Sequence, residues 1–192
     1  MGDFFRIGAE PAFVAAWDSW LQSTLHSARA ALGPRWEGCY MSAPIWRFSL
    51  APGLAGPGLM VGVIMPSVDR VGRAFPLTLV MRGAGRDAMA AHQCHAATFD
   101  ALEAIALSAL DETVTRAKLA EAMAEVHPVT TAKVARDATR SVKRISVWSA
   151  LNGDAAPYLR VFDGMPPAAQ AGDFFDPIPS VDAAAAAPRC AQ

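Results

Sequence analysis

The sequence is poor in cysteine and carries almost no net charge. Its cysteines, Cys39, Cys94 and Cys190, are widely spaced and odd in number, and none stands in a paired metal-ligand spacing. Such cysteines favour reduced thiols in a cytosol over a disulfide framework. Because 17 lysines and arginines face 18 acidic residues, the chain lacks the electrostatic footprint of a protein that binds nucleic acid or anionic lipid. We therefore expect no nucleic-acid partner.

A secretory signal and a membrane span are also missing. The N-terminal region carries Asp3, Arg6, Glu10 and Asp18, where a signal peptide would have an apolar core. The longest apolar stretch, residues 59–65, is far shorter than the roughly 20 residues that a transmembrane helix requires. The sequence predicts a soluble cytoplasmic protein without membrane insertion.

Apolar residues, in contrast, are abundant and make up 53% of the 192 residues. This fraction is sufficient to bury a core without disulfides, metal or an organic cofactor, so we predict no cofactor. We expect one domain over residues 1–176 and an alanine- and proline-rich tail over 177–192 that frays. The tryptophans are expected in the core, and any exposed one would mark an interface: Trp17, Trp20, Trp36, Trp46 and Trp148.

Residues 11–32 predict a long helix. Pro11 suits a first helical turn, and Gly33 directly follows the periodic segment as a stop signal. The predicted apolar stripe recurs at three- and four-residue steps and consists of Phe13, Trp17, Leu21, Thr24 and Ala28.

A strand-rich segment follows this helix. Residues 46–50 alternate apolar and polar side chains, which predicts a strand with one buried face, and residues 59–65 form a second apolar strand after a wide, turn-rich loop. A polar loop at 67–73 separates this hairpin from another extended segment at 75–81. Pro76 predicts that the last segment is a sheet edge or contains a bulge.

The remaining elements are two helices and a second hairpin. Residues 87–110 predict the longest helical segment, and 115–126 a shorter helix. Strands at 142–149 and 158–161 flank a predicted Asn152-Gly153 turn. Hairpins on either side of a helical middle predict one α+β domain with a largely antiparallel sheet and helices packed on it, a pattern that includes an α/β/α sandwich.

The motif Gly-Ala-Gly-Arg-Asp-Ala at residues 83–88 matches the dinucleotide fingerprint G-x-G-x-x-A. Gly83 and Gly85 would let backbone amides approach a pyrophosphate at a helix N-terminus. The fingerprint also needs a parallel strand after the helix with an acidic residue at its end, whereas Asp100 lies inside the predicted helix and another helix follows. A flexible turn between strand and helix is the favoured interpretation.

His92, Cys94 and His95 lie together on the predicted long helix, and the two histidines have the i, i+3 spacing of some metal sites. The sequence contains no second pair of ligands, no G-x-S-x-G nucleophile motif and no G-x-x-x-x-G-K-[ST] phosphate loop. We favour a helical histidine pair without metal and predict that the protein is not an enzyme.

Among the segments that lie between predicted strands, the loop at 67–73 has the highest density of charged residues. Arg70 and Arg73 supply two guanidinium groups that suit a carboxylate or phosphate on a partner. In the alternative interpretation, Asp69 forms an internal ion pair that fixes the loop. Both interpretations stay open, and the candidate partner-binding residues are Ser67, Asp69, Arg70 and Arg73.

A series of motifs runs along most of the chain. The shorter ones are Gly-Asp-Phe at 2–4, Trp-Asp-Ser-Trp-Leu at 17–21, Ser-Ala-Pro-Ile-Trp-Arg-Phe at 42–48, Ser-Val-Trp-Ser at 146–149 and Val-Phe-Asp-Gly-Met-Pro at 161–166. The longest motif occupies residues 62–79 and contains the charged loop. In content and order these motifs resemble the TagF family, also called type VI secretion-associated BMA-type proteins.

This resemblance implies a posttranslational negative regulator, or repressor, of bacterial type VI secretion. Family members are understood to bind the forkhead-associated scaffold protein of the secretion machine, so the implied mechanism is sequestration of that scaffold by protein-protein interaction. Some members are fused to a Ser/Thr phosphatase domain, which makes a phosphatase of the same pathway a second implied partner. No catalytic residues carry over from the family.

Two other functions stay open. A structural or assembly accessory of the secretion machine rests on the same resemblance, and it differs from a repressor in whether deletion abolishes or raises secretion. A dinucleotide-binding enzyme would use Gly83 and Gly85, and a nucleotide titration would detect it.

Overall fold

The structure, a computed structural model, describes residues 7–69, 72–111, 113–127, 143–152 and 155–177. Several features of the sequence analysis lie outside the described residues. They are the Gly-Asp-Phe motif at 2–4, Arg70, Gly153 of the predicted turn, Cys190 and the tail at 178–192.

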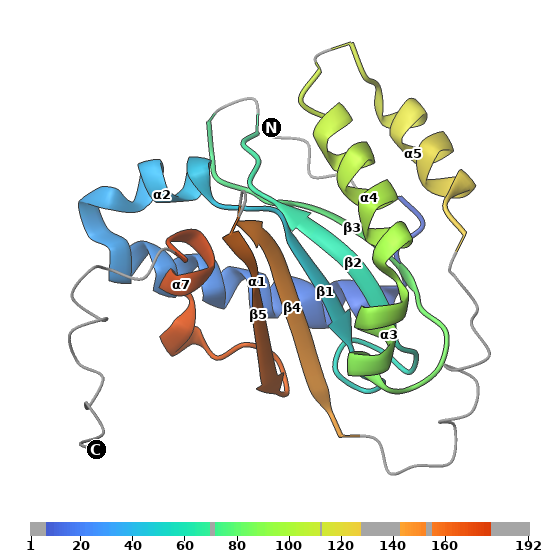
Figure 1. Ribbon diagram of the computed structural model, residues 1–192. Coiled ribbons are helices and arrows are strands. Elements are labelled where there is room, and N and C mark those ends of the chain that lie inside the picture. Colours follow the sequence, from blue (N-terminus) through green and yellow to red (C-terminus); the bar gives the residue numbers. More distant parts are fainter. Residues whose placement is uncertain (1–6, 70–71, 112, 128–142, 153–154, 178–192) are drawn as a thin grey trace.

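The strands form one antiparallel sheet in the order β3-β2-β1-β4-β5 (Figure 1). β1 is central because it pairs with β2 on one side and with β4 on the other. The predicted α+β domain with an antiparallel sheet is confirmed. The strand bounds are β1 Trp46–Leu50, β2 Met60–Met65, β3 Leu77–Arg82, β4 Ile145–Asn152 and β5 Ala155–Asp163.

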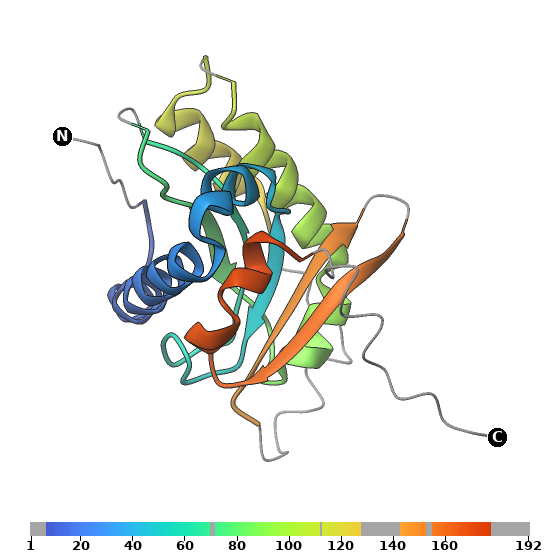
Figure 2. The same ribbon diagram turned by 90° about the vertical axis from the view of Figure 1, so that its left-hand side faces the viewer.

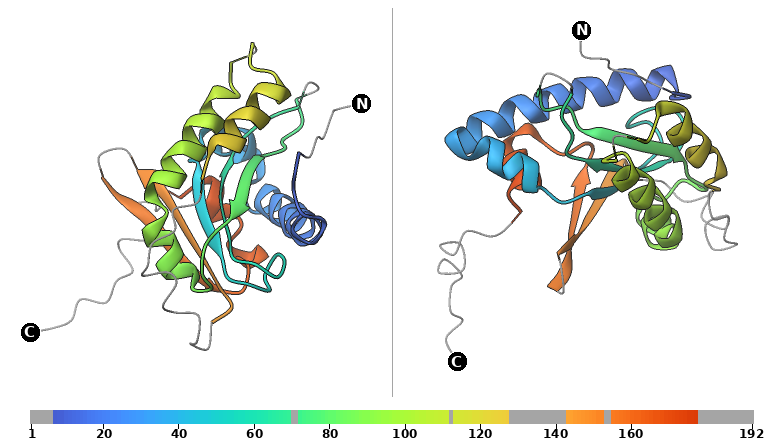
Figure 3. Two further views of the ribbon diagram at one scale, coloured as in Figure 1. Left: turned by 90° about the vertical axis from the view of Figure 1, so that its right-hand side faces the viewer. Right: turned by 90° about the horizontal axis from the view of Figure 1, so that it is seen from above.

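Helices cover both faces of the sheet, which makes a three-layer α/β/α sandwich (Figure 3, right). One face carries α1 Pro11–Leu32, α2 Trp36–Ser42 and α7 Gly172–Phe175, with short 3-10 helices at Gly33–Arg35 and Ala168–Gln170. In Figure 2, α7 lies between α1 and the β4–β5 hairpin. The other face carries α3 Ala88–Cys94 and α4 Ala96–Ser108, and α5 Arg116–Glu125 packs against α4.

The bounds of α1 agree with the prediction, and so does its apolar stripe. Pro11 occupies the first turn, and Gly33 ends the helix with a φ of 52°, a conformation that glycine adopts readily. Every residue of the predicted stripe is buried, and Leu32 joins them. Trp17 and Trp46 are both buried in the core, as expected.

The prediction of one helix over 87–110 is wrong, because His95 divides it into α3 and α4. The backbone of His95 leaves the helical region, with φ of −96° and ψ of 24°. Its imidazole is fully buried, and Nδ1 lies 3.3 Å from Thr98 Oγ1. The break therefore lets a polar ring enter the core beside the start of the next helix.

The second hairpin is longer than predicted and irregular. β4 and β5 pair from Ile145 and Asp163 up to Asn152 and Ala155, with a register shift after Ala150. β3 is an edge strand in this sheet, as predicted from Pro76.

Strand β1 sends its side chains into two different cores. Trp46, Phe48 and Leu50 pack on the α1 side, in a cluster rich in aromatic rings. Gly62 on β2 makes room for Phe48, because a Cβ at Gly62 would lie 2.5 Å from the phenyl ring. Arg47 faces α4 on the other side of the sheet, where the core is mostly aliphatic. The prediction of one buried face for this strand is therefore wrong, because helices cover both faces.

Candidate functional site

The loop between β2 and β3 contains the candidate partner-binding residues. Val68 and Ala74 form an antiparallel bridge that continues the two strands into the loop. Asp69 N donates to Arg73 O at 3.0 Å, and Gly72 N donates to Asp69 O at 2.9 Å. Gly72 has a φ of 77°, which glycine tolerates because it has no Cβ. The loop is thus held by its own backbone hydrogen bonds.

An ion pair also fixes this loop. Asp69 Oδ1 accepts a hydrogen bond from Arg73 N at 2.9 Å, and Asp69 Oδ2 accepts one from Arg73 Nε at 2.6 Å. The Asp69 side chain is 10% exposed, whereas that of Arg73 is 56% exposed. The internal ion pair considered from the sequence is therefore present, and it holds an arginine that still reaches solvent. Arg70 lies outside the described residues.

Ser67 is tied to α2 through its backbone. Ser67 N donates to Tyr40 Oη at 3.1 Å, and the Tyr40 hydroxyl donates to Ser67 O at 2.6 Å. Phe75 N donates to the same carbonyl at 2.9 Å. Burial raises the pKa of Tyr40 to about 12, partly offset by the hydrogen bonds to the Ser67 and Phe75 backbone, so the hydroxyl keeps its proton at neutral pH. Nothing in the local sequence around Tyr40 signals this contact.

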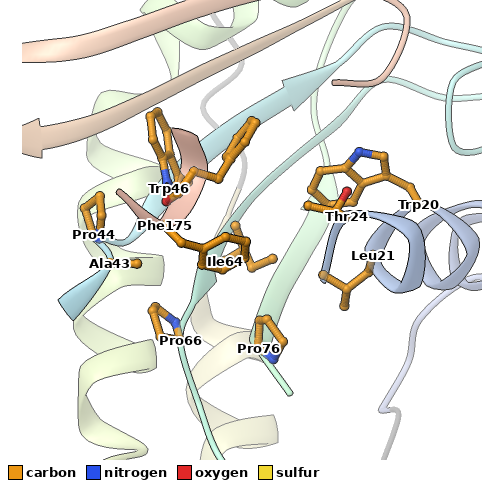
Figure 4. A pocket seen from close by; sticks show the side chains of 11 residues that line it. Trp20, Leu21, Thr24, Ala43, Pro44, Trp46, Ile64, Pro66, Pro76 and Phe175 are labelled. Atoms are coloured by element: carbon orange, nitrogen blue, oxygen red, sulfur yellow. Dashed lines mark hydrogen bonds between the residues drawn. The ribbon is translucent and has the colours of Figure 1, made fainter. Parts of the chain in front are cut away.

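A small apolar pocket lies beside the base of the loop (Figure 4). Pro66 and Pro76 flank the loop in sequence, and they lie near one another on one side of the pocket. The volume is about 20 Å³, enough for one water-sized molecule or a methyl group. It suits the tip of one apolar side chain and is too small for a nucleotide. The lining residues are Trp20, Leu21, Thr24, Ala43, Pro44, Trp46, Ile64, Pro66, Pro76, Phe174 and Phe175.

The glycine-rich motif at 83–88 forms the turn between β3 and α3. Asp87 Oδ1 accepts hydrogen bonds from Met89 N at 2.8 Å and from Ala90 N at 3.1 Å. These amides open the helix and would face a pyrophosphate. A carboxylate of the chain already occupies that position as a helix cap.

The glycines of this turn are explained by packing and backbone geometry. A Cβ on Gly83 would lie 2.3 Å from Leu59 Cδ2, so the backbone approaches the aliphatic core closely. Gly85 has a φ of 84°, which favours glycine. In the order β3-β2-β1, the central strand β2 pairs antiparallel with both of its neighbours. The parallel β-α-β unit of a dinucleotide-binding fold is therefore absent from these described strands.

The two histidines of the predicted pair enter different surroundings. His92 lies between Ser49 Oγ, 3.0 Å from Nδ1, and Ser149 Oγ, 2.8 Å from Nε2. His95 is buried beside Thr98. Within the part of the chain that the structure describes, no group of three or more His, Cys, Asp or Glu side chains is arranged to hold a metal ion.

Arg47 completes a polar network around His92. Its Nε and Nη2 donate to Glu103 at 2.8 and 2.6 Å, and Nη2 also donates to Asp100 Oδ1 at 2.8 Å. Burial, followed by the positive charge of Arg47, lowers the pKa of His92 to about 4, so this imidazole is neutral near pH 7. The sequence showed that polar residues alternate with apolar ones in β1. It did not show which helix covers the polar ones, because the covering helix lies far away in the chain: Ser49 and His92 are 43 residues apart.

Residues 1–126 match the family described as TagF N-terminal domain, Type VI secretion system-associated. The chain is also similar to the crystal structure of PA0076 from Pseudomonas aeruginosa PAO1, with a TM-score of 0.80 and 29% sequence identity over 94% of this chain and 91% of that chain. A search among curated proteins gave no match. No helix among the described residues has both the length and the apolar character to cross a membrane. Since the family match extends over more than half of the chain, this protein belongs to the TagF family of type VI secretion-associated proteins.

Proposed function

We propose that this protein is a posttranslational negative regulator of type VI secretion that acts in the cytoplasm and is not an enzyme. The observation that carries this proposal is the match of residues 1–126 to the TagF N-terminal domain. The regulator binds a forkhead-associated scaffold protein and sequesters it, so that the secretion machine does not assemble. A Ser/Thr phosphatase of the same pathway is a further proposed partner.

The proposed contact surface is the β2–β3 loop, with Ser67, Asp69, Arg70 and Arg73 as its polar residues. The hydrogen bonds from Tyr40 to Ser67 and from Arg73 to Asp69 support this choice, because they order the two described arms of the loop before a partner arrives. A surface that is already ordered loses less conformational entropy on binding. A guanidinium group also suits acidic or phosphorylated groups, because its planar donors match two oxygens at once.

Exposed apolar side chains flank the same loop. Val68 and Phe75 lie on its two arms. The small pocket beside Pro66 adds an apolar recess. These features favour a partner segment in which an acidic or phosphorylated residue stands next to an apolar one.

Arg70→Ala and Arg73→Ala, made singly, test this surface. Arg86→Ala is the matched control, because Arg86 is an exposed arginine on the turn between β3 and α3. Thermal unfolding and pull-down of the scaffold protein are measured side by side. We expect at least one loop variant to lose scaffold binding at an unchanged melting temperature, while Arg86→Ala binds normally. Normal binding by both loop variants, or binding losses that follow equal losses of stability, would remove the loop from the interface.

A further inference from the structure

The helical layer formed by α3 and α4 stops short of strand β5. Val147 on β4 is fully buried beneath α3, whereas Val161, its direct neighbour on β5, is 46% exposed. The next pair along the hairpin shows the same difference. Ser149 on β4 contacts His92 of α3, whereas Leu159, the partner of Ser149 on β5, is 60% exposed. The hairpin extends past these helices in Figure 3 (left). Within the part of the chain that the structure describes, apolar side chains of the last strand are therefore left without a covering helix.

Leu151 on β4 extends this exposed region and is itself 60% exposed. We call Leu151, Leu159 and Val161 the uncovered strip. It belongs to two adjacent strands, and neighbouring strands lie about 4.8 Å apart. A helix with its side chains is about 10 Å across, so one helix is wide enough to cover such a strip.

The polar network beside the strip has an excess of negative charge. Asp100 and Glu103 on α4 share the single guanidinium group of Arg47. The Asp100 side chain remains 67% exposed. Arg47 on β1 pairs with Ser149 on β4, which in turn pairs with Leu159 on β5. Two strand spacings separate Arg47 from Leu159, so their backbones are roughly 10 Å apart. A lysine or arginine at the edge of an occupant would complement this charge.

The edge of β5 is less suited to a partner strand than its face is to a helix. Pro157 lies within β5 and has no N–H to donate to another strand. Arg160 adds a charged side chain, paired with Asp173 at 2.9 Å, and charges on an edge strand disfavour strand pairing. An occupant that packs on the open face would instead continue the layer of α4 and α3.

We infer that the uncovered strip is the docking surface for an amphipathic helix of a partner protein, with apolar residues on the strip and a lysine or arginine toward Asp100. This inference does not rest on the proposed regulatory function, because the strip and the β2–β3 loop belong to different elements. The two surfaces can therefore be tested separately.

The first step of the test identifies what covers the strip in the cell. The photo-crosslinking residue p-benzoylphenylalanine replaces Leu159 in the full chain, and mass spectrometry identifies the captured peptide. The control carries the same residue in place of Ile7, an exposed apolar residue that precedes α1. We expect position 159, and not position 7, to capture one segment of another protein with helical apolar spacing and a basic residue. Capture of a second copy, capture of another part of the same chain, or no capture would overturn the inference.

The second step measures binding of a synthetic peptide with the captured sequence by calorimetry and circular dichroism. We expect the peptide to gain helix on binding, and Leu159→Asp to weaken its affinity about tenfold without changing the melting temperature. Asp100→Asn should weaken it about threefold at low salt and less at high salt. Ile7→Asp is the control and should bind as the wild type does. A peptide that binds without gaining helix, or equal affinity for Leu159→Asp and wild type, would contradict a docked helix.

Discussion

The two faces of the sheet differ in how they are filled. The α1 face is packed with rings, and Trp148 lies at its centre in contact with Trp17, Trp20, Phe48 and Phe174. The α3 and α4 face combines aliphatic side chains with a partly buried polar network, and Leu159 and Val161 of β5 stay exposed there.

This difference distributes aromatic packing and titratable side chains unequally between the two faces of the sheet. Aromatic rings bury the largest apolar areas, so the α1 face supplies most of the side-chain packing that is lost on unfolding. Buried titratable groups make the opposite face sensitive to pH, because they must be neutral or paired to stay buried.

The largest expected effect is the loss of a tryptophan from the α1 face. Trp17→Ala and Trp46→Ala should each lower the free energy of unfolding by about 3 to 5 kcal/mol, because each leaves a cavity in a packed core. Leu159→Ala on the uncovered strip should change it by less than about 0.5 kcal/mol. Urea unfolding measures all three. Wild-type stability of both tryptophan variants together with lost scaffold binding would make these rings interface residues and refute the packing.

The next effect concerns pH and arises on the opposite face. The pKa of His92 falls from 6.5 to about 4 on folding, so the unfolded chain takes up this proton first as the pH drops. Stability should decrease from pH 6.5 to pH 4, by about 3 kcal/mol from this group, and the contribution should be constant above and below that window. The test compares urea unfolding of the wild type and His92→Gln across the window.

The slope should become shallower in His92→Gln without disappearing. Burial also lowers the pKa of His95, which acts in the same direction. Identical pH dependence of the variant and the wild type would show that the partly buried imidazole of His92 does not titrate as the structure requires.

A smaller loss of stability is expected when a glycine on either side of the sheet is replaced by alanine, and the two replacements compare the two cores. A Cβ at Gly62 would lie 2.4 Å from the Leu79 carbonyl oxygen, whereas one at Gly83 would meet the flexible tip of Leu59 at 2.3 Å. Gly62→Ala and Gly83→Ala should each cost about 1 to 3 kcal/mol, with Gly62→Ala the more severe. Gly38→Ala is the control, because no atom lies within 4 Å and helix α2 gains stability from alanine. A Gly83→Ala variant as stable as the wild type would reopen a ligand role for this glycine.

The smallest effect on stability is expected at the charged loop. Asp69→Ala removes an ion pair with a partly exposed arginine, so the free energy of unfolding should fall by less than about 1 kcal/mol. Scaffold binding should nevertheless weaken, because the loop loses its order. Full binding by Asp69→Ala would show that the ion pair does not prepare the loop for the partner.

Much of the fold could be predicted because its signals are local. Helix α1 has a proline at its start, a glycine after its end and a regular apolar stripe, and β1 and β2 show clear strand patterns. The short helices α2 and α7 were missed because they contain too few residues to show a helical period. The break at His95 was missed because it accompanies burial of the His95 ring in the core, which depends on how the helices pack on the sheet.

The site could be predicted in part for the same reason. The pairing of Asp69 with Arg73 joins residues four apart, and the sequence already offered it as an alternative. The contacts of Tyr40 with Ser67 and of Arg47 with Glu103 join residues 27 and 56 apart. These contacts follow from how the helices are placed against the sheet, which a single sequence does not determine.

The most direct test of the regulatory account is the amount of type VI tube protein released by a strain that lacks this protein. Sequestration of the scaffold predicts that deletion raises release, that the wild-type gene lowers it again, and that an Arg70→Ala, Arg73→Ala double variant fails to do so although it accumulates normally. Loss of release on deletion would contradict repression and make the protein an assembly component of the secretion machine.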